Sequence, residues 1–371
     1  MRDTMGIILT NDEKIPPITD LRAVGALPIA GSYRMIDFIL SNMSNAGIVN
    51  VGVITESNYS SLMDHMKSGN PWDLNRKNYG LKILPPNLAA FDYYAGRGDL
   101  DRLAGARYFL RKSNQTYVIL SLDNLIYNMD LEDVLEKHIE NQSDITIVYK
   151  DISGTSEAEL SRHTLIELDN NNRVTDIEVK PQYPKSTKAR LGLFVMEKAL
   201  LESIIDECVS RGEHYFVRDG LSKKLSGIMI NGYEFKGYCD KIDSLKSYFE
   251  NNMAFLSQKY RNELLDPKKP IYTKNKDLSP SVYKENAKVE NSLISNGCHI
   301  EGTVKNSVLS RGVVVKKGAV VKNSIIMQDS VIEENVSIDY AILDKEVVIT
   351  GGKKLVGQES YPVAIAKGSI V

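Results

Sequence analysis

Residues 303–338 read TVKNSVLSRGVVVKKGAVVKNSIIMQDSVIEENVSI, and this stretch decides the fold of the C-terminal part of the chain. Its aliphatic residues recur at six-residue intervals, and the same spacing begins upstream of it. A six-residue period is typical of a parallel β-helix, in which each hexad forms one side of a coil and its aliphatic residue points inward. The series comprises Ile294, Ile300, Val308, Val314, Val320, Ile326, Ile332 and Ile338.

The pair Asn-Ser recurs at 291–292, 306–307 and 323–324, where small polar residues suit the tight corners of such a coil. An ordinary antiparallel sheet would instead show period two and hairpin turns rich in glycine and proline. We therefore predict a β-helix domain over 281–371. Because a coil of this kind has open ends and flat faces, we also expect it to take part in oligomerisation.

Upstream of the repeats, residues 266–280 carry prolines and charges that break both helix and strand patterns, which predicts a linker. Residues 1–265 alternate short β-branched runs with helical patterns, as is typical of parallel βαβ units. The predicted strands are 6–10, 49–55, 117–122, 144–150 and 191–196. The predicted helices are 32–43 with Ser32 as N-cap and Gly47 as its end, 99–111 with Asp99 as N-cap, and 244–265.

Composition narrows the class of protein. The formal net charge of the 371 residues is −2, so no bulk electrostatic field favours nucleic acid or membrane as a partner. The three cysteines lie far apart, without the paired spacing of a zinc site or a disulfide framework. No apolar run reaches transmembrane length. We expect a cytoplasmic protein with small anionic ligands.

Motifs along the chain carry a resemblance to a known family. Arg22, Ala23, Pro28 and the run GSYRMIDF at 31–38 closely resemble the signature R-A-K-P-A-V-P-F-G-G-K-Y-R-I-I-D-F of bacterial ADP-glucose pyrophosphorylases, also called glucose-1-phosphate adenylyltransferases. Further segments match that family in order, at 51–55, 93–96, 120–124, 178–181, 190–193 and 237–240. The resemblance implies an α/β fold: a Rossmann-like, GT-A-like nucleotidyltransferase domain followed by a left-handed parallel β-helix of hexapeptide repeats.

The resemblance also implies a reaction. A sugar phosphate attacks the α-phosphorus of ATP and pyrophosphate leaves, with Mg²⁺ held by two aspartates, which match Asp123 and Asp240 here. Asp123 follows an apolar strand, at the edge where open α/β sheets bind ligands, although an Asp-Asn turn would explain it as well. Lys180 matches the lysine that meets the sugar phosphate, and a solvated lysine before proline is its structural alternative.

The remaining residues of the implied nucleotide and sugar-phosphate pocket are Lys14, Arg22, Arg34, Gly96 and Gly192. Several ligand-facing motifs depart from the family pattern. The loop at 9–19 lacks the family's glycines, which let backbone N–H groups approach a triphosphate, and carries Asp12 and Glu13 instead. The substituted positions elsewhere are Val24, Val179, Arg190 and Tyr215, and Ser32 replaces a lysine implicated in the family's effector site.

Intact fold-specifying patterns beside eroded ligand motifs predict a catalytically impaired, regulatory subunit. By resemblance, it would assemble with a catalytic paralogue, as a hetero-tetramer, in glycogen biosynthesis, and its own pocket would bind a sugar phosphate or nucleotide weakly. One alternative is an active adenylyltransferase with an atypical ATP loop. A more distant one is a hexapeptide-repeat acyltransferase, for which His299 is the only histidine in the β-helix.

Overall fold

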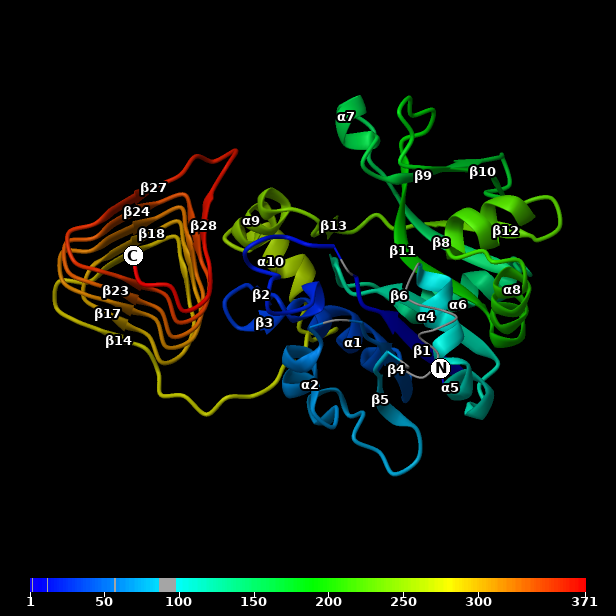
Figure 1. Ribbon diagram of the computed structural model, residues 1–371, viewed down its shortest axis with the longest axis horizontal. Helices are drawn as coiled ribbons and strands as arrows, with labels where there is room; N and C mark the ends of the chain where they lie inside the picture. Colours follow the sequence, from blue (N-terminus) through cyan, green and yellow to red (C-terminus); the bar gives the residue numbers. More distant parts are fainter. Residues whose placement is uncertain (2, 12, 57, 87–97) are drawn as a thin grey trace.

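A mixed nine-stranded sheet forms the centre of the N-terminal domain in this computed structural model, which describes residues 1, 3–11, 13–56, 58–86 and 98–371 (Figure 1). Seven strands follow the order β10-β9-β11-β6-β1-β4-β5, and β8 and β12 extend the sheet beside β11. The strands are β1 Thr4–Leu9, β4 Asn50–Ile54, β5 Gly80–Leu84, β6 Tyr117–Leu122, β8 Ile145–Asp151, β9 Thr164–Leu168, β10 Val174–Val179, β11 Lys188–Glu197 and β12 Ile230–Glu234.

All five predicted strands are present, but the prediction of parallel units holds for only part of the sheet. Strands β4, β1 and β6 pair in parallel, whereas β11 runs antiparallel to both β6 and β8. The reason lies in the connection between β8 and β11. It carries the antiparallel pair β9–β10 instead of a long crossover helix that would return the chain in a parallel direction.

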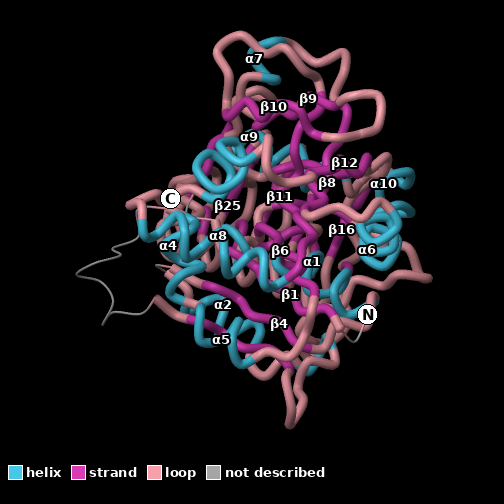
Figure 2. The backbone as a smooth tube through the Cα atoms, turned by 90° about the vertical axis from the view of Figure 1, so that its right-hand side faces the viewer, coloured by secondary structure: helices cyan, strands magenta, loops and turns pink. Residues whose placement is uncertain are grey.

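Helices cover both faces of this sheet (Figure 2). One core packs residues of α4 and α8 against one face, and a second packs residues of α1 and α6 against the other. The helices are α1 Met35–Asn45, α2 Ser60–Met66, α4 Asp99–Gly105, α5 Arg107–Lys112, α6 Leu131–Glu140, α7 Glu157–Leu160, α8 Lys198–Ser210, α9 Leu245–Ala254 and α10 Gln258–Leu264.

Two predicted N-caps were wrong. At α1, the carboxylate of Asp37 accepts from the Arg34 N–H at 2.9 Å, while the Ser32 hydroxyl lies 3.1 Å from Ser295 of the β-helix. At α4, Asp101 accepts from the Gly98 N–H, while Asp99 accepts from the distant Phe216 N–H. In both cases a tertiary contact takes the side chain that local pattern assigned to the cap.

One predicted helix end is correct, and two predicted helices are each divided into two. Gly47 follows α1 with φ +70°, a left-handed conformation that suits glycine, so its prediction is confirmed. The predicted helix 99–111 is two helices that meet at Ala106, and 244–265 is likewise divided into α9 and α10.

The C-terminal domain is a left-handed β-helix with three five-stranded parallel sheets. The first sheet contains β14 Val282–Tyr283, β17 His299–Ile300, β20 Val314–Val315, β23 Val331–Ile332 and β26 Val348–Ile349. The second contains β15 Lys288–Glu290, β18 Thr303–Lys305, β21 Val320–Lys322, β24 Ser337–Asp339 and β27 Lys354–Val356. The third contains β16 Leu293–Ile294, β19 Val308–Leu309, β22 Ile325–Ile326, β25 Ala341–Leu343 and β28 Val363–Ile365.

The six-residue register predicted for the coil interior is correct at some positions and displaced by one at others. Ile326, Ile332 and Ile338 are buried in the interior, but Val314 and Val320 are only half-buried, and their neighbours are fully buried instead. Residues paired across successive coils are mostly seventeen positions apart, as Ile326 and Leu343 are, and fifteen apart in the early coils, as His299 and Val314 are. A strict step of six would require eighteen, so the pattern drifts from one coil to the next.

Asparagines form the predicted corners of the coil. Asn291, Asn306 and Asn323 adopt left-handed backbone with φ of 43°, 46° and 42°, a conformation that asparagine tolerates well. Their side-chain amides also form a ladder, in which Asn291 donates to Asn306 at 2.8 Å and Asn306 to Asn323 at 3.3 Å. The Asn-Ser pairs are therefore explained by corner geometry.

The three central strands of the third sheet, β19, β22 and β25, are buried on both faces, because the outer face of this sheet packs against the N-terminal domain. Ile325, Met327 and Ile342 share a core cluster with Phe38 and Tyr248. A buried ion pair between Arg22 and Asp344 crosses the same boundary. The segment 266–280 runs along the N-terminal domain, and the proposed boundaries 1–265, 266–280 and 281–371 stay a prediction. No helix among the described residues is long and apolar enough to cross a membrane.

Candidate functional site

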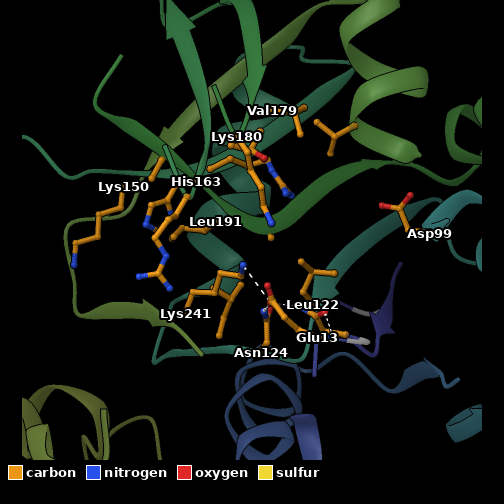
Figure 3. Close-up of a pocket in the computed structure, with 18 of the residues that line it drawn as sticks. Glu13, Asp99, Leu122, Asn124, Lys150, His163, Val179, Lys180, Leu191 and Lys241 are labelled. Carbon is orange, nitrogen blue, oxygen red and sulfur yellow. Dashed lines mark hydrogen bonds and ion pairs between the residues drawn. The ribbon is translucent and has the colours of Figure 1, made fainter. Parts of the chain in front are cut away.

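A cleft of about 670 Å³ opens in the N-terminal domain beside the carboxyl end of β6 (Figure 3). The short strand β13 Cys239–Lys241, which pairs with β7 Leu125–Tyr127, contributes one wall. Among the described residues, seven cationic and five acidic side chains line the cleft, and this balance favours an anionic ligand only weakly. The cations are Arg102, Lys150, Arg162, Lys180, Arg190, Arg218 and Lys241.

Asp123 lies directly after β6, as predicted, but its carboxylate is fully buried. One oxygen accepts from the Asn11 N–H at 2.7 Å, and the other accepts from the Gly25 N–H at 3.0 Å. These bonds hold the chain between β1 and β2 Pro28–Ile29 (residues 10–11 and 13–27, hereafter the first loop) against the central strand. Its neighbours Leu122 and Asn124 line the cleft. Asp123 therefore has a structural task in this fold.

Asp240, the second predicted metal ligand, does line the cleft. Its two oxygens accept from the side-chain amide of Asn251 at 2.8 Å and from the Lys241 N–H at 2.7 Å. Burial raises the pKa of Asp240 above its usual range, despite these bonds. Both oxygens of Asp240 are thus engaged in hydrogen bonds within the chain.

Magnesium needs hard oxygen ligands that remain open to it and to its water shell. Asp123 is sealed from solvent, and both of its oxygens accept backbone hydrogen bonds. Both oxygens of Asp240 accept hydrogen bonds as well. The two aspartates, as they stand in this structure, do not fit a magnesium ion. Their roles as catalytic and metal residues stay predictions.

The first loop places a carboxylate on the cleft wall. Glu13 lies 3.3 Å from Lys241 and also accepts from the side chain of Asn11 at 3.3 Å (Figure 3). A triphosphate bound here would be repelled by the Glu13 carboxylate. Lys241, the nearby cation, is already paired with Glu13. Asp12 lies outside the described residues.

The predicted sugar-phosphate wall is partly present. Lys180 lines the cleft and is exposed, and its backbone has φ +47°, an uncommon conformation for a residue with a Cβ atom. Gly192 also lines the cleft, where a Cβ atom would approach a Leu122 methyl group to 2.5 Å. Val179 and Tyr215, which replace polar residues of the family pattern, are exposed in the same cleft.

Arg190 adds a cation that the family pattern lacks. Its guanidinium lies 5.2 Å from the Phe194 ring, and its Nε has no hydrogen-bond partner among the described residues. Burial lowers the pKa of Arg190 to about 10, against an opposing attraction from Asp99. The charge is therefore held in apolar surroundings, where it fills space that the family's serine would leave open.

The other predicted pocket residues lie elsewhere. Lys14 and Arg22 line a smaller pocket of about 170 Å³ on the first loop, and the Arg22 guanidinium reaches away to Asp344. Arg34 lines a third pocket, between the two domains. Gly96 lies outside the described residues. Of the predicted residues that the structure describes, the main cleft brings together Lys180, Gly192 and Asp240.

Sequence reasoning missed several residues of the main cleft. Lys150 donates to the Gly237 carbonyl at 2.9 Å, and Arg162 contacts Asp243 at 2.6 Å. His163 lies beside them, with a pKa that burial lowers, so the ring is neutral near pH 7. Of these three residues, only Lys150 had a local indication in the sequence, because it lies at the end of a predicted strand. Arg162 and His163 reach the cleft because the β9–β10 insertion carries them there.

The Asp123 anchor leads to a first prediction. A Cβ atom at Gly25 would lie 2.3 Å from Asp123 Oδ2, so Gly25→Ala must push that carboxylate out of its two hydrogen bonds. We expect a loss of about 1–3 kcal/mol in the free energy of unfolding, measured by urea titration. Gly105→Ala is the control, because no atom lies within 4 Å of its new methyl group and helical alanine is favoured. Equal effects of the two substitutions would contradict the anchor.

Comparison with known proteins agrees with this architecture. Residues 9–258 match the nucleotidyl transferase family, and residues 278–361 match the GlmU-like C-terminal hexapeptide family. The chain is 33% identical to the glucose-1-phosphate adenylyltransferase of Bacillus cytotoxicus, over 96% of this chain and 95% of that protein. It is 32% identical to the glycogen biosynthesis protein GlgD of Bacillus subtilis, over 99% and 96%. The two identities are nearly equal, so they do not show whether this chain is more like the adenylyltransferase or more like GlgD. That comparison has to be made at the residues of the site.

Proposed function

Because this chain belongs to the glucose-1-phosphate adenylyltransferase family, we propose that it is a catalytically impaired subunit that regulates a catalytic paralogue in glycogen biosynthesis. The observation that carries the proposal is the state of Asp123. The aspartate that matches a family metal ligand uses both oxygens to bind the backbone of its own first loop. Asp123 therefore acts as a structural anchor, and neither of its oxygens is open to bind a metal ion.

Three further features support impairment. Glu13 pairs with Lys241 on the wall where the resemblance places the triphosphate. Both oxygens of Asp240 are hydrogen-bonded within the chain, and Arg190 lines the sugar side of the cleft. Phosphoryl-type transfer depends on positioned cations and donors, because the protein contributes little covalent chemistry. A cleft with fewer open donors can still bind a sugar phosphate or nucleotide weakly, and we propose that it does.

The second candidate is an active adenylyltransferase. It is favoured by Lys180 and Asp240, which still line the cleft, and by an identity to a named adenylyltransferase as high as that to GlgD. An active chain would have to release Asp123 from Asn11 and Gly25 during turnover. No specific observation favours the acyltransferase alternative, since His299 is exposed on the outer surface of the coil.

Mixing this chain with the catalytic paralogue of the same organism tests the proposal. We expect a complex, tetrameric by resemblance to the family, with altered kinetic constants or effector response. A coupling of about 1–3 kcal/mol between subunits changes an apparent affinity by roughly 5–150-fold. The proposed place of action is the cytoplasm, which fits three buried thiols without a disulfide among them. No complex, or a complex with unchanged kinetics, would remove the regulatory role.

A pocket between the two domains is the proposed effector site. It is lined by Ser32, where the family has a lysine, and by a group of cations. These are Arg34, Lys274, Lys276, Arg311 and Lys345. With a volume of about 30 Å³, it suits one phosphate group more than a whole sugar. The missing family lysine argues against sugar-phosphate activation, but the cations that remain support binding of a phosphate-sized anion.

Protonation of Lys345 gives this pocket an expected pH dependence. Burial, followed by repulsion from Arg34 and Arg22, lowers the pKa of Lys345 to about 7, while Asp344 raises it and Lys276 lowers it further. An anion binds the protonated form better, so the affinity for inorganic phosphate should rise as pH falls from about 8 to about 6. Calorimetric titration at both pH values measures this.

Two lysine variants control for the titration of phosphate itself. Lys345→Met should remove most of the pH dependence. Lys317→Met, which removes an exposed lysine elsewhere on the coil, should leave it intact. An unchanged pH dependence in Lys345→Met would show that another group is responsible.

A further inference from the structure

The first sheet of the β-helix has an outer face that is turned away from the N-terminal domain (Figure 1). One column of this face is apolar apart from a single histidine. It runs from coil to coil through Val282, His299, Val314, Val331 and Val348, which are exposed or half-buried. The third sheet, by contrast, is already covered by the N-terminal domain.

A second column on the same face is charged and alternates in sign. It contains Lys284, Glu301, Lys316 and Glu333, one from each successive coil, followed by Thr350. Backbone bonds fix this order, because Lys284 donates to the carbonyl of Ile300 and Glu301 to that of Val315. Lys316 and Glu333 also lie 3.6 Å apart within the chain.

We propose that two copies of this chain pair through this face, about a twofold axis that lies in the interface and runs parallel to the strands. Such an axis keeps each column opposite itself and reverses the order of the coils. With the axis between the coils of Glu301 and Lys316, Lys284 meets Glu333 of the second copy, and Glu301 meets its Lys316. Four pairs of opposite charge then flank two apolar columns in contact.

Other arrangements are disfavoured by the same pattern. An axis along the coil would set the valine column against the charged column and bury unpaired charge. A shift of half a coil spacing would bring Glu301 against Glu333 of the second copy and Lys316 against Lys316 of the second copy, which are like charges. A shift of a whole coil keeps opposite charges facing each other but forms only two such pairs, so the alternation favours the axis that forms all four.

The second sheet lacks this self-complementarity, which makes it a natural control. Its charged column reads Glu290, Lys305, Lys322 and Asp339 from coil to coil. Reversing that order sets Glu290 against Asp339 and Lys305 against Lys322, so both contacts are repulsive. The occupant proposed for the first sheet is thus a second copy of this chain, identified by charge complementarity.

Sedimentation analysis of the isolated full-length chain tests the pairing without any activity assay. The wild type should dimerise, or show a larger even-numbered assembly. Val314→Glu places a charge in the centre of the apolar column and should weaken this association about a hundredfold or more. Val320→Glu is the matched control, since Val320 is also half-buried and outward on the second sheet, and its mass should not change. A monomeric wild type, or equal effects of the two variants, would overturn the proposal.

A charge swap separates pairing from folding. Glu301→Lys sets a lysine side chain against Lys316 of the second copy and should also weaken the dimer. Adding Lys316→Glu to this variant restores opposite charges in the same register, so the double variant should recover most of the association that the single variant loses. Circular dichroism confirms that each variant is folded. Failure of the double variant to recover would overturn the pairing, even if the single variants dissociate.

Discussion

Purified alone and given ATP, glucose 1-phosphate and Mg²⁺, this chain is expected to form ADP-glucose at least about a thousandfold more slowly than a catalytic member of its family. The loss of one preorganised donor in an active site costs roughly 10²–10³ in rate. Here Glu13 places a carboxylate on the cleft wall beside Lys241, and both oxygens of Asp123 accept from the backbone N–H groups of Asn11 and Gly25. A coupled assay for released pyrophosphate measures the rate directly.

Two variants sharpen this result. Replacing the loop at 9–19 with the family's glycine loop should leave the rate within about tenfold of the starting value, because Val179, Arg190 and Tyr215 still line the cleft. Asp240→Asn should leave the rate of the mixed complex unchanged, if the catalytic paralogue performs the chemistry. A rate comparable to that of a catalytic member, or a large loss on Asp240→Asn, would favour the active-enzyme alternative.

Asp344→Ala is expected to lower the free energy of unfolding by about 3–5 kcal/mol, because it leaves the Arg22 guanidinium charged, buried and without its partner. The two side chains are 3% and 2% exposed, and their charged atoms are 2.7 Å apart. Asp344 also accepts from the Lys345 N–H at 2.7 Å. The contact joins the first loop region to the β-helix, so both domains should be affected.

Urea unfolding followed by the fluorescence of Trp72, the only tryptophan, reports on the N-terminal domain. Removing both partners by Arg22→Met with Asp344→Leu should recover much of the loss, since no charge is then stranded. Asp73→Ala breaks an exposed ion pair with Arg76 and should cost no more than about 1 kcal/mol. If Asp344→Ala cost as little, the pair would not join the domains energetically.

The architecture can be predicted from the sequence alone, because the patterns that specify it are periodic and local. Aliphatic residues at hexad spacing require a coil that buries them, and the Asn-Ser pairs supply corners that asparagine can adopt. The apolar runs predicted all five strands near their observed bounds. These features depend on residues close in sequence, where pattern and geometry are directly linked.

Three features depend on contacts between distant parts of the chain: the direction of β11, which residues of each coil strand are buried and which are half-buried, and the hydrogen bonds of the site residues. Sequence motifs placed Asp123 and Arg22 in a ligand pocket. The fold instead pairs Asp123 with backbone groups 112 and 98 positions away, and Arg22 with a carboxylate 322 positions away. A buried charge is stable only when it is paired or hydrogen-bonded, and its partners are set by the tertiary fold. Because these partners are distant in sequence, local spacing along the chain does not predict them.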